Sequence, residues 1–302
     1  MNKNRVRGIL SAVFATIFMG SLGVFVKNLS ISPIVITFFR LFIAAVLIFF
    51  TILIKGKIKE LKNMPSKELF LSGFSLTANI VFYIIAIQKT SMSNAVFLLY
   101  LGPIFASLIA FLFLGESLRG IDILSLLMAL AGILFMLKFK FNIGKEELSG
   151  IVCGVLAGIS YGVLIVSNRM IKQDVHLLIR GFYQFVIGFL ILLPMCISLF
   201  KVDIILENIK VLLAIGFING FLGITLMFNA IKNLKSVEYG VFSYLEVAYA
   251  VLFGVIFFSE TVDIFKIIGG IFILFAGLLQ VLKTHKITYK ENFLKSRQEI
   301  DP

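Results

Sequence analysis

From Ala86 to Glu116 the chain reads AIQKTSMSNAVFLLYLGPIFASLIAFLFLGE, and from Ala230 to Glu260 it reads AIKNLKSVEYGVFSYLEVAYAVLFGVIFFSE. The two stretches lie 144 residues apart and align without a gap. Eight of the 31 positions are identical, among them a tyrosine within the apolar run and the glutamate that ends it. Apolar composition alone is not expected to give this match, so we infer that the second half of the chain repeats the first.

The helices that open the two halves carry the same row of small residues. In the second half the row is Gly150, Gly154, Gly158 and Gly162, and 142 residues earlier it is Gly8, Ala12, Thr16 and Gly20. A spacing of four places each row on one helix face, where small side chains let two helix backbones approach closely in lipid. We expect a packing seam there, and a face that lines a substrate path remains the alternative.

Apolar runs fill the 302-residue chain, of which 60% is hydrophobic and only 15% charged. About 20 apolar residues in a helix cross a hydrocarbon core of roughly 30 Å. Ten runs approach this length: Gly8–Val26, Pro33–Ile54, Leu69–Ile87, Ser93–Leu114, Ile121–Leu137, Gly150–Asn168, Leu177–Phe200, Val211–Ile231, Val237–Phe258 and Val262–Leu282. The sequence therefore predicts an all-α integral membrane protein with ten transmembrane helices.

Five crossings per half is an odd number, so the second half must start on the opposite side of the membrane from the first. We expect two inverted five-helix repeats, residues 1–140 and 141–284, followed by a polar cytoplasmic tail, residues 285–302. Inverted repeats are typical of secondary transporters, whose substrate site lies near the bilayer midplane. This arrangement predicts a carrier that works by alternating access.

Positive residues set the expected orientation. If both termini are cytoplasmic, 18 of the 28 Lys and Arg residues fall on the cytoplasmic side and eight on the outer side, while Arg40 and Arg180 lie within spans. This bias follows the positive-inside rule. It accounts for the net charge of +12 without nucleic acid. We expect a multi-pass protein of the cytoplasmic membrane whose partners are the lipid bilayer and a small-molecule substrate, either as a monomer or as a homodimer.

At this point the chain resembles the EamA-type carriers of the drug/metabolite transporter superfamily. The resemblance rests on the ten helices, the repeat of five, Tyr83, Ala86, Pro103 and the Leu114-Gly115-Glu116 block, with Phe258-Ser259-Glu260 in the second half. The second half departs from the pattern, because Glu246 and Val247 replace Gly102 and Pro103. The resemblance implies transport of a small polar metabolite, often an amino acid or a related compound, by alternating access.

Glu246 is the principal candidate for a functional residue, because a carboxylate within a membrane span is costly unless it is paired or faces water. Tyr239, Tyr244 and Tyr249 lie on the same predicted helix. A carboxylate beside aromatic rings suits an ammonium group, through ion pairing and cation–π attraction. A proton-coupling role is a second interpretation. A structural hydrogen bond between helices, or a pair with Arg40, is a third.

Arg40 and Gln184 occupy equivalent positions of the two halves, 144 residues apart, so we expect both to face one central cavity. Arg40 would hold a substrate carboxylate with two parallel hydrogen bonds, or it would neutralise Glu246. The remaining candidates for substrate contact or coupling are Tyr83, Tyr100, Asn94 and Glu238. For Asn94 and Glu238, which fall near helix starts, capping of the helix is an equal alternative.

The chain carries no nucleotide-binding loop, no nucleophile elbow and no pair of zinc ligands. We therefore expect no enzyme activity, no metal and no cofactor, and a gradient rather than ATP as the energy source. The competing classes are a non-transporting receptor or assembly factor, and an integral-membrane enzyme. A receptor would need a sizeable loop or tail, and an enzyme would need clustered His, Asp or Glu residues; the sequence favours neither.

Overall fold

The computed structural model describes residues 3–62, 66–117, 119–138, 144–171 and 175–298. Only the backbone is described for Lys62, Ser236, Val237 and residues 284–298. The predicted boundary between the halves, at residues 140 and 141, lies outside these ranges, as do Lys140, Lys172 and the last four residues of the predicted tail. The two domain ranges and the tail therefore stay predictions.

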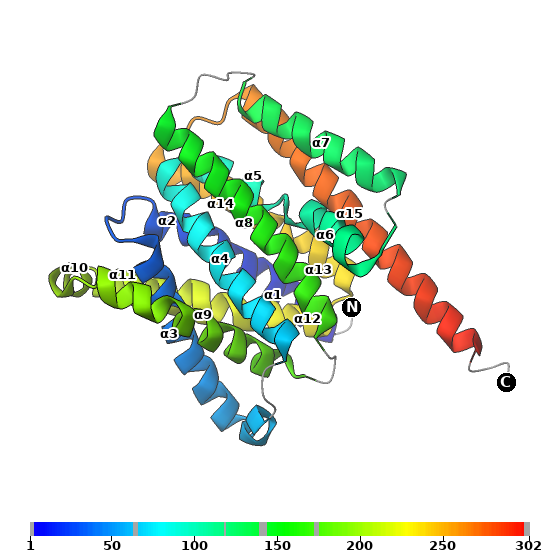
Figure 1. Cartoon of the computed structure of the whole chain (residues 1–302), viewed down its shortest axis with the longest axis horizontal. Helices are drawn as coiled ribbons and strands as arrows, with labels where there is room; N and C mark the ends of the chain where they lie inside the picture. The colour runs from blue at the N-terminus through cyan, green and yellow to red at the C-terminus, as the bar shows by residue number, and fades with distance from the viewer. Residues whose placement is uncertain (1–2, 63–65, 118, 139–143, 172–174, 299–302) are drawn as a thin grey trace.

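Every regular element within the described residues is helical (Figure 1). The α-helices are α1 (Lys3–Gly20), α2 (Leu22–Val26), α3 (Pro33–Ile54), α4 (Lys67–Lys89), α5 (Met92–Leu99), α6 (Gly102–Leu114), α7 (Gly120–Met136), α8 (Lys145–Met170), α9 (Leu177–Leu199), α10 (Val202–Glu207), α11 (Ile209–Ala214), α12 (Gly223–Asn233), α13 (Ser236–Ser243), α14 (Leu245–Phe258) and α15 (Ile264–Gln298). A 3-10 turn, η1 (Ile58–Lys62), and a π-helical segment, η2 (Ile215–Leu222), complete the set.

Nine helical segments of the described chain are long and apolar enough to cross a membrane. They are Lys3–Val26, Pro33–Ile54, Lys67–Lys89, Met92–Leu114, Lys145–Met170, Leu177–Leu199, Ile209–Asn233, Glu238–Phe258 and Ile264–Lys283. The fifth predicted span, Ile121–Leu137, forms α7, an apolar helix of 17 residues that extends about 25 Å at 1.5 Å per residue. Because this length falls short of a hydrocarbon core, this crossing stays a prediction.

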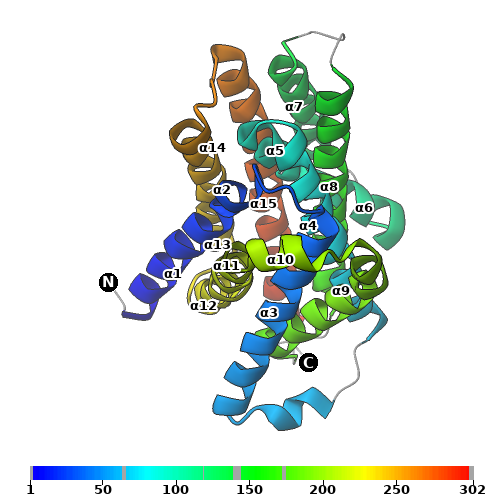
Figure 2. The same cartoon turned by 90° about the vertical axis from the view of Figure 1, so that its left-hand side faces the viewer.

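The helices pack as pairs that bring distant parts of the chain together. Helix α4 lies along α8, α7 lies along α15, α3 packs on α9, and α1 packs on α12 (Figures 1 and 2). The last part of α15 projects beyond the bundle in Figure 1. The glycine row of α8 permits close packing, since a Cβ on Gly158 would lie 2.6 Å from the backbone oxygen of Leu98. This contact is the packing seam that the small residues predicted.

The predicted fourth and ninth spans are each broken in the middle. In the fourth, α5 ends at Leu99 and α6 begins at Gly102, with Pro103 in its first turn, where a proline costs no hydrogen bond. In the ninth, α13 and α14 meet at Tyr244 without any proline. The two breaks fall at repeat-equivalent tyrosines, Tyr100 and Tyr244. Each of these spans was expected to be one continuous helix. The breaks divide them, so that α6 and α14 both begin near the centre of the bundle.

Candidate functional site

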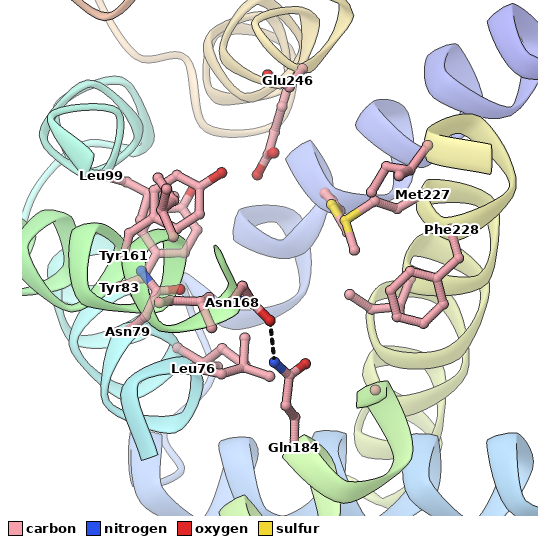
Figure 3. A pocket seen from close by; sticks show the side chains of 18 of the residues that line it. Leu76, Asn79, Tyr83, Leu99, Tyr161, Asn168, Gln184, Met227, Phe228 and Glu246 are labelled. Carbon is pink, nitrogen blue, oxygen red and sulfur yellow. Dashed lines mark hydrogen bonds between the residues drawn. The ribbon is translucent and has the colours of Figure 1, made fainter. Parts of the chain in front are cut away.

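A cavity of about 560 Å³ lies among the helices of both halves. Its wall is mostly apolar, with a smaller polar set composed of Thr16, Arg40, Asn79, Tyr83, Tyr100, Tyr161, Asn168, Arg169, Arg180, Gln184, Tyr239, Ser243 and Glu246. The cavity reaches the surface beside Arg169 and Ile231, whose side chains are exposed. Figure 3 shows Glu246 pointing into this space, with Tyr83 and Tyr161 on one side and Met227 and Phe228 on the other.

Glu246 lies in the first turn of α14, because the ninth span breaks two residues earlier. An acidic residue in the first turn of a helix interacts favourably with the helix dipole. The hydroxyl of Tyr100 lies 3.0 Å from Oε2 of Glu246 and 2.5 Å from the carbonyl oxygen of Ser243, and these two acceptors share its single hydrogen. The inter-helix hydrogen bond considered for Glu246 is therefore present, and it joins the two helix breaks.

Arg40 is buried in the middle of α3 and is 9% exposed. Its Nη2 donates to the carbonyl of Asn219, in the π-helical segment, at 3.2 Å. Gly220 permits this approach, because a Cβ there would lie 2.9 Å from the backbone oxygen of Arg40. Within the described residues Arg40 and Glu246 form no ion pair, although they interact electrostatically across the cavity.

Gln184, the repeat equivalent of Arg40, also lines the cavity. Its amide nitrogen donates to Ser72 and to the side-chain oxygen of Asn168, both at 2.9 Å, and the second bond is drawn in Figure 3. Tyr83, Tyr100 and Tyr239 line the same cavity. Six of the ten residues predicted for the site thus meet in one place.

The other four predicted residues lie outside the cavity lining. The ring of Tyr244 packs 5.3 Å from that of Tyr100, with its hydroxyl against α15, and Tyr249 stacks on Phe253 beside α1. Asn94 is buried at the start of α5, where its backbone N–H donates to Ser91. These residues lie away from the cavity because a helix presents only part of its surface to any one neighbour, and their side chains are on other faces.

Glu238 lies in a separate surface hollow. It forms an ion pair of 2.6 Å with Arg5 and accepts a hydrogen bond from the backbone N–H of Lys235 at 3.1 Å. The second bond belongs to a helix cap, which is the alternative that the sequence left open for this residue.

Sequence reasoning did not single out Tyr161, Asn168 and Arg180 as lining residues. Tyr161 stands among the glycines of α8, and its ring passes over Gly102, where a Cβ would lie 2.2 Å from Cδ1 of the tyrosine. Arg180 was recognised as a charge within a span, and that signal was sufficient to make it a candidate.

A second polar cluster lies outside the cavity lining, where α2 and α14 end and α5 begins, and we call it the Lys27–Glu260 cluster. It comprises Lys27, Thr90, Met92, Ser93 and Glu260. The ammonium group of Lys27 donates to Oε1 of Glu260 at 2.8 Å and to the carbonyl of Thr90 at 2.7 Å. Glu260 also accepts from the backbone N–H of Met92 at 2.7 Å and from the hydroxyl of Ser93 at 3.2 Å. The cluster thereby fastens α2, the start of α5 and the end of α14 to one another.

Glu260 lies between two membrane spans, and the cluster sets its ionisation. Burial alone would raise the pKa of its carboxyl group, but the hydrogen bonds from Lys27 and from the Met92 amide outweigh burial and hold the pKa below its ordinary value. Its side chain is 7% exposed and that of Lys27 is 18% exposed. The carboxyl group of Glu260 is therefore a largely buried anion held beside Lys27.

Known proteins resemble this chain in both of its halves. The sequence profile of the EamA-like transporter family matches residues 6–138 and residues 148–282. An uncharacterized transporter of Archaeoglobus fulgidus is 27% identical over 90% of this chain and 95% of its own length. The pseudopaline exporter CntI of Pseudomonas aeruginosa is 27% identical over 89% of this chain and 94% of its own.

A protein of known crystal structure shares the fold, with a TM-score of 0.62 at 18% identity over 93% of this chain and 98% of that one. The family matches cover most of the chain, and the relatives named above are transporters that align over nearly their whole length. They point to a transporter rather than an enzyme. The protein therefore belongs to the EamA-like transporter family and is a multi-pass membrane transporter.

Proposed function

We propose that the protein is a secondary carrier that moves a small polar metabolite, such as an amino acid or an amine, across the cytoplasmic membrane by alternating access. The cavity carries this proposal, because it reaches the surface beside Arg169 and Ile231. At the other end, the described lining includes no member of the Lys27–Glu260 cluster. A site that is open to one side and closed to the other is what alternating access requires of each state.

Ten crossings in two inverted repeats form the proposed framework, with α7 as the fifth crossing. Helix packing supports it, because exchanging the halves turns one set of contacts into another. The contact of α4 with α8 exchanges with that of α12 with α1, and the contact of α6 with α8 exchanges with that of α14 with α1. The contacts of α3 with α9 and of α7 with α15 map onto themselves. The family profile also matches two successive segments of the chain.

The proposed orientation has both termini in the cytoplasm, following the distribution of Lys and Arg. The open end of the cavity then faces the cytoplasm, and the Lys27–Glu260 cluster faces outward. In this assignment the structure corresponds to an inward-open state.

Two repeat-equivalent ion pairs are the proposed gates. Glu260 is 144 residues from Glu116, and Lys27 is 142 residues from Arg169, the same displacements that relate the two halves. Arg169 and Glu116 form an ion pair of 2.7 Å at the open end, with 46% and 38% of their side chains exposed. In the outward-open state the pair at the cytoplasmic end would become buried while the Lys27–Glu260 cluster separates.

Glu246 is proposed to bind an amine or a coupling proton, and Arg40 to bind or balance negative charge. Tyr83, Tyr100 and Tyr239 would shape the pocket. Support comes from the cavity, which contains all five side chains. The similarity to a pseudopaline exporter favours a polar metabolite as cargo and efflux as the direction.

Reconstituted vesicles test the proposal. A thermal-shift panel of amino acids, amines, nucleosides and sugar phosphates selects the probe compound, whose uptake is then measured. Glu246→Gln is expected to abolish uptake or uncouple it from the proton gradient, with an unchanged elution volume. Glu207→Gln, on the exposed surface of α10, serves as the matched control. Wild-type flux in Glu246→Gln removes Glu246 from the mechanism, and the absence of flux for every stabilising compound contradicts the carrier.

A further inference from the structure

We infer that the cavity selects an anionic amino-acid-type metabolite, with two acidic groups and one ammonium group, over a neutral zwitterion. The inference rests on the proposed carrier function and concerns the charge of its substrate.

Charge in the cavity wall is unbalanced. The charged side chains in the described lining are three arginines, Arg40, Arg169 and Arg180, and one carboxylate, Glu246. Arg169 is paired with Glu116 at the mouth and is thereby neutralised. Two cations and one anion remain inside, so the wall carries an excess of one positive charge when Glu246 is ionised.

Arg40 has most of its hydrogen-bonding capacity unused. A guanidinium group carries five N–H donors. Among the described residues, the bond from Arg40 to the carbonyl of Asn219 is its one protein hydrogen bond. A buried cation with so few partners is costly, and an anion that accepts two parallel hydrogen bonds relieves that cost.

Arg180, which lies nearer the opening of the cavity beside Arg169, also makes few hydrogen bonds to the protein. Its Nη1 donates to the carbonyl of Asn168 at 3.4 Å, the long end of the hydrogen-bond range. Its Nε is buried and has no hydrogen-bond partner within the described part of the chain. Arg180 belongs to the first turn of α9, and Arg40 to the middle of α3. Two guanidinium groups on different helices therefore offer separate places for two acidic groups.

Glu246 supplies the complement for an ammonium group. Its carboxylate accepts the Tyr100 hydroxyl, and it forms no ion pair with either arginine in the described structure. The tyrosines beside it favour a cation through their ring faces. One substrate with two acidic groups and one ammonium group would thus pair with all three charges, whereas a neutral amino acid would leave one arginine without a partner.

The test measures binding to the purified full-length protein, without any transport. L-Glutamate, L-glutamine and glutarate are the probes, because glutamine replaces one carboxylate by a neutral amide of the same shape and glutarate lacks the ammonium group. Apparent affinities follow from the dependence of the melting temperature on probe concentration. We expect glutamate to bind about 10-fold or more tightly than glutamine, since a hydrogen bond to a charged group contributes about 1.5–3 kcal/mol.

Variants assign the preference to residues. Arg180→Gln is expected to bring glutamate and glutamine to within about threefold of each other, while Glu246→Gln removes the preference for glutamate over glutarate. Lys232→Gln, an exposed lysine beside the mouth, is the matched control and is expected to leave both ratios unchanged.

Three results would overturn the inference: glutamine that binds as tightly as glutamate, an unchanged ratio in Arg180→Gln, or no stabilisation by any of the three probes. Its failure is distinguishable from that of the carrier proposal. Selective binding without flux in vesicles would contradict the carrier and leave the charge preference standing. Equal flux of glutamate and glutamine would contradict only the charge preference.

Discussion

The two ends of the cavity carry the same pair of charges in different surroundings. At the closed end, Lys27 and Glu260 are largely buried and belong to a network of backbone and side-chain hydrogen bonds. At the open end, Arg169 and Glu116 are more than one third exposed. A buried pair that loses one partner costs about 3–5 kcal/mol, whereas an exposed pair contributes about 0.2–1 kcal/mol. The same chemistry therefore holds one end firmly and the other weakly.

One side chain explains part of this difference. Gly254 lies directly against the carboxylate of Glu260, where a Cβ would be 2.7 Å from Oε2. The equivalent position in the first half is Ala110, which already carries a Cβ. The two loops otherwise have the same geometry. Gly115 and Ser259 both adopt left-handed backbone angles. The N–H of Glu116 bonds to the carbonyl of Ala110, and in the same way the N–H of Glu260 bonds to the carbonyl of Gly254. A missing methyl group thus gives Glu260 room to be buried.

Glu260→Gln is expected to have the largest effect on the comparison. It leaves Lys27 buried without an anion, at a cost of about 3–5 kcal/mol, and so favours opening of the outer end. The measurement is alkylation of Ser243→Cys, inside the cavity, by an impermeant reagent added outside, in a chain whose Cys153 and Cys196 are replaced by alanine. The rate is expected to rise at least about 10-fold.

Glu116→Gln is the control for that experiment. Its pair is exposed in the state described, so its loss costs that state less than about 1 kcal/mol. The pair is proposed to be buried in the outward-open state, where the loss costs more, so labelling from outside is expected to slow rather than to accelerate. Equal acceleration by the two substitutions would show that burial does not distinguish the two ends.

Gly254→Ala is expected to have an intermediate effect. The added methyl group must displace the Glu260 carboxylate, and overpacking of this kind costs about 1–3 kcal/mol. The same alkylation rate is expected to rise several-fold. Ala110→Gly, the reciprocal change, removes a methyl group from the open end and is expected to leave outside labelling unaltered. If Gly254→Ala labels as slowly as the unsubstituted chain, the missing methyl group is not the reason for the burial of Glu260.

Ser259→Gly tests the loop that presents Glu260. Ser259 has a φ of 51°, which a residue with a Cβ adopts at a cost and which glycine adopts freely. The substitution is expected to stabilise the protein by about 0.5–1 kcal/mol, and to raise the melting temperature by about 1–3 °C. Gly115→Ser, at the equivalent position with a φ of 67°, is expected to lower it. A fall in the melting temperature of Ser259→Gly would contradict the strain at this position.

Acid gives the smallest expected effect. The pKa of Glu260 is lower in the folded protein than its ordinary value of 4.5, so its contribution to closure is present above that value and is lost as the pH falls through the lowered pKa. Labelling of Ser243→Cys from outside is therefore expected to stay flat from about pH 8 to about pH 5, after correction for the reactivity of the thiol. A steep change within that range would mean that another group controls the closed end.

Hydropathy predicted the positions of the spans well. Each spanning segment must by itself avoid exposing polar groups to lipid, so the signal for each span lies within its own sequence. Nine of the ten predicted runs correspond to apolar helices of sufficient length, and Pro33–Ile54 matches to the residue. The helix breaks were harder to predict. Pro103 signals the first break, but no proline or glycine marks the second at Tyr244.

The candidate site was predicted in part. Charges and amides at repeat-equivalent places, Arg40 and Gln184, do meet at the cavity. Tyr249 and Asn94 do not line it, and Tyr161 does. Which face of a helix meets a cavity depends on its neighbours, and Tyr161 reaches the cavity because Gly102 on another helix leaves room for its ring.

The sequence by itself determined that the chain is helical, lies in a membrane and repeats itself, because hydrophobic length and self-similarity are properties of the order of residues. Only the tertiary structure decided that Lys27 meets Glu260 in a largely buried cluster and that Arg169 meets Glu116 in an exposed pair. It also decided that Arg40 and Arg180 line one cavity with few hydrogen bonds to the protein. Burial and pairing are relations between segments far apart in the chain, and packing alone sets them.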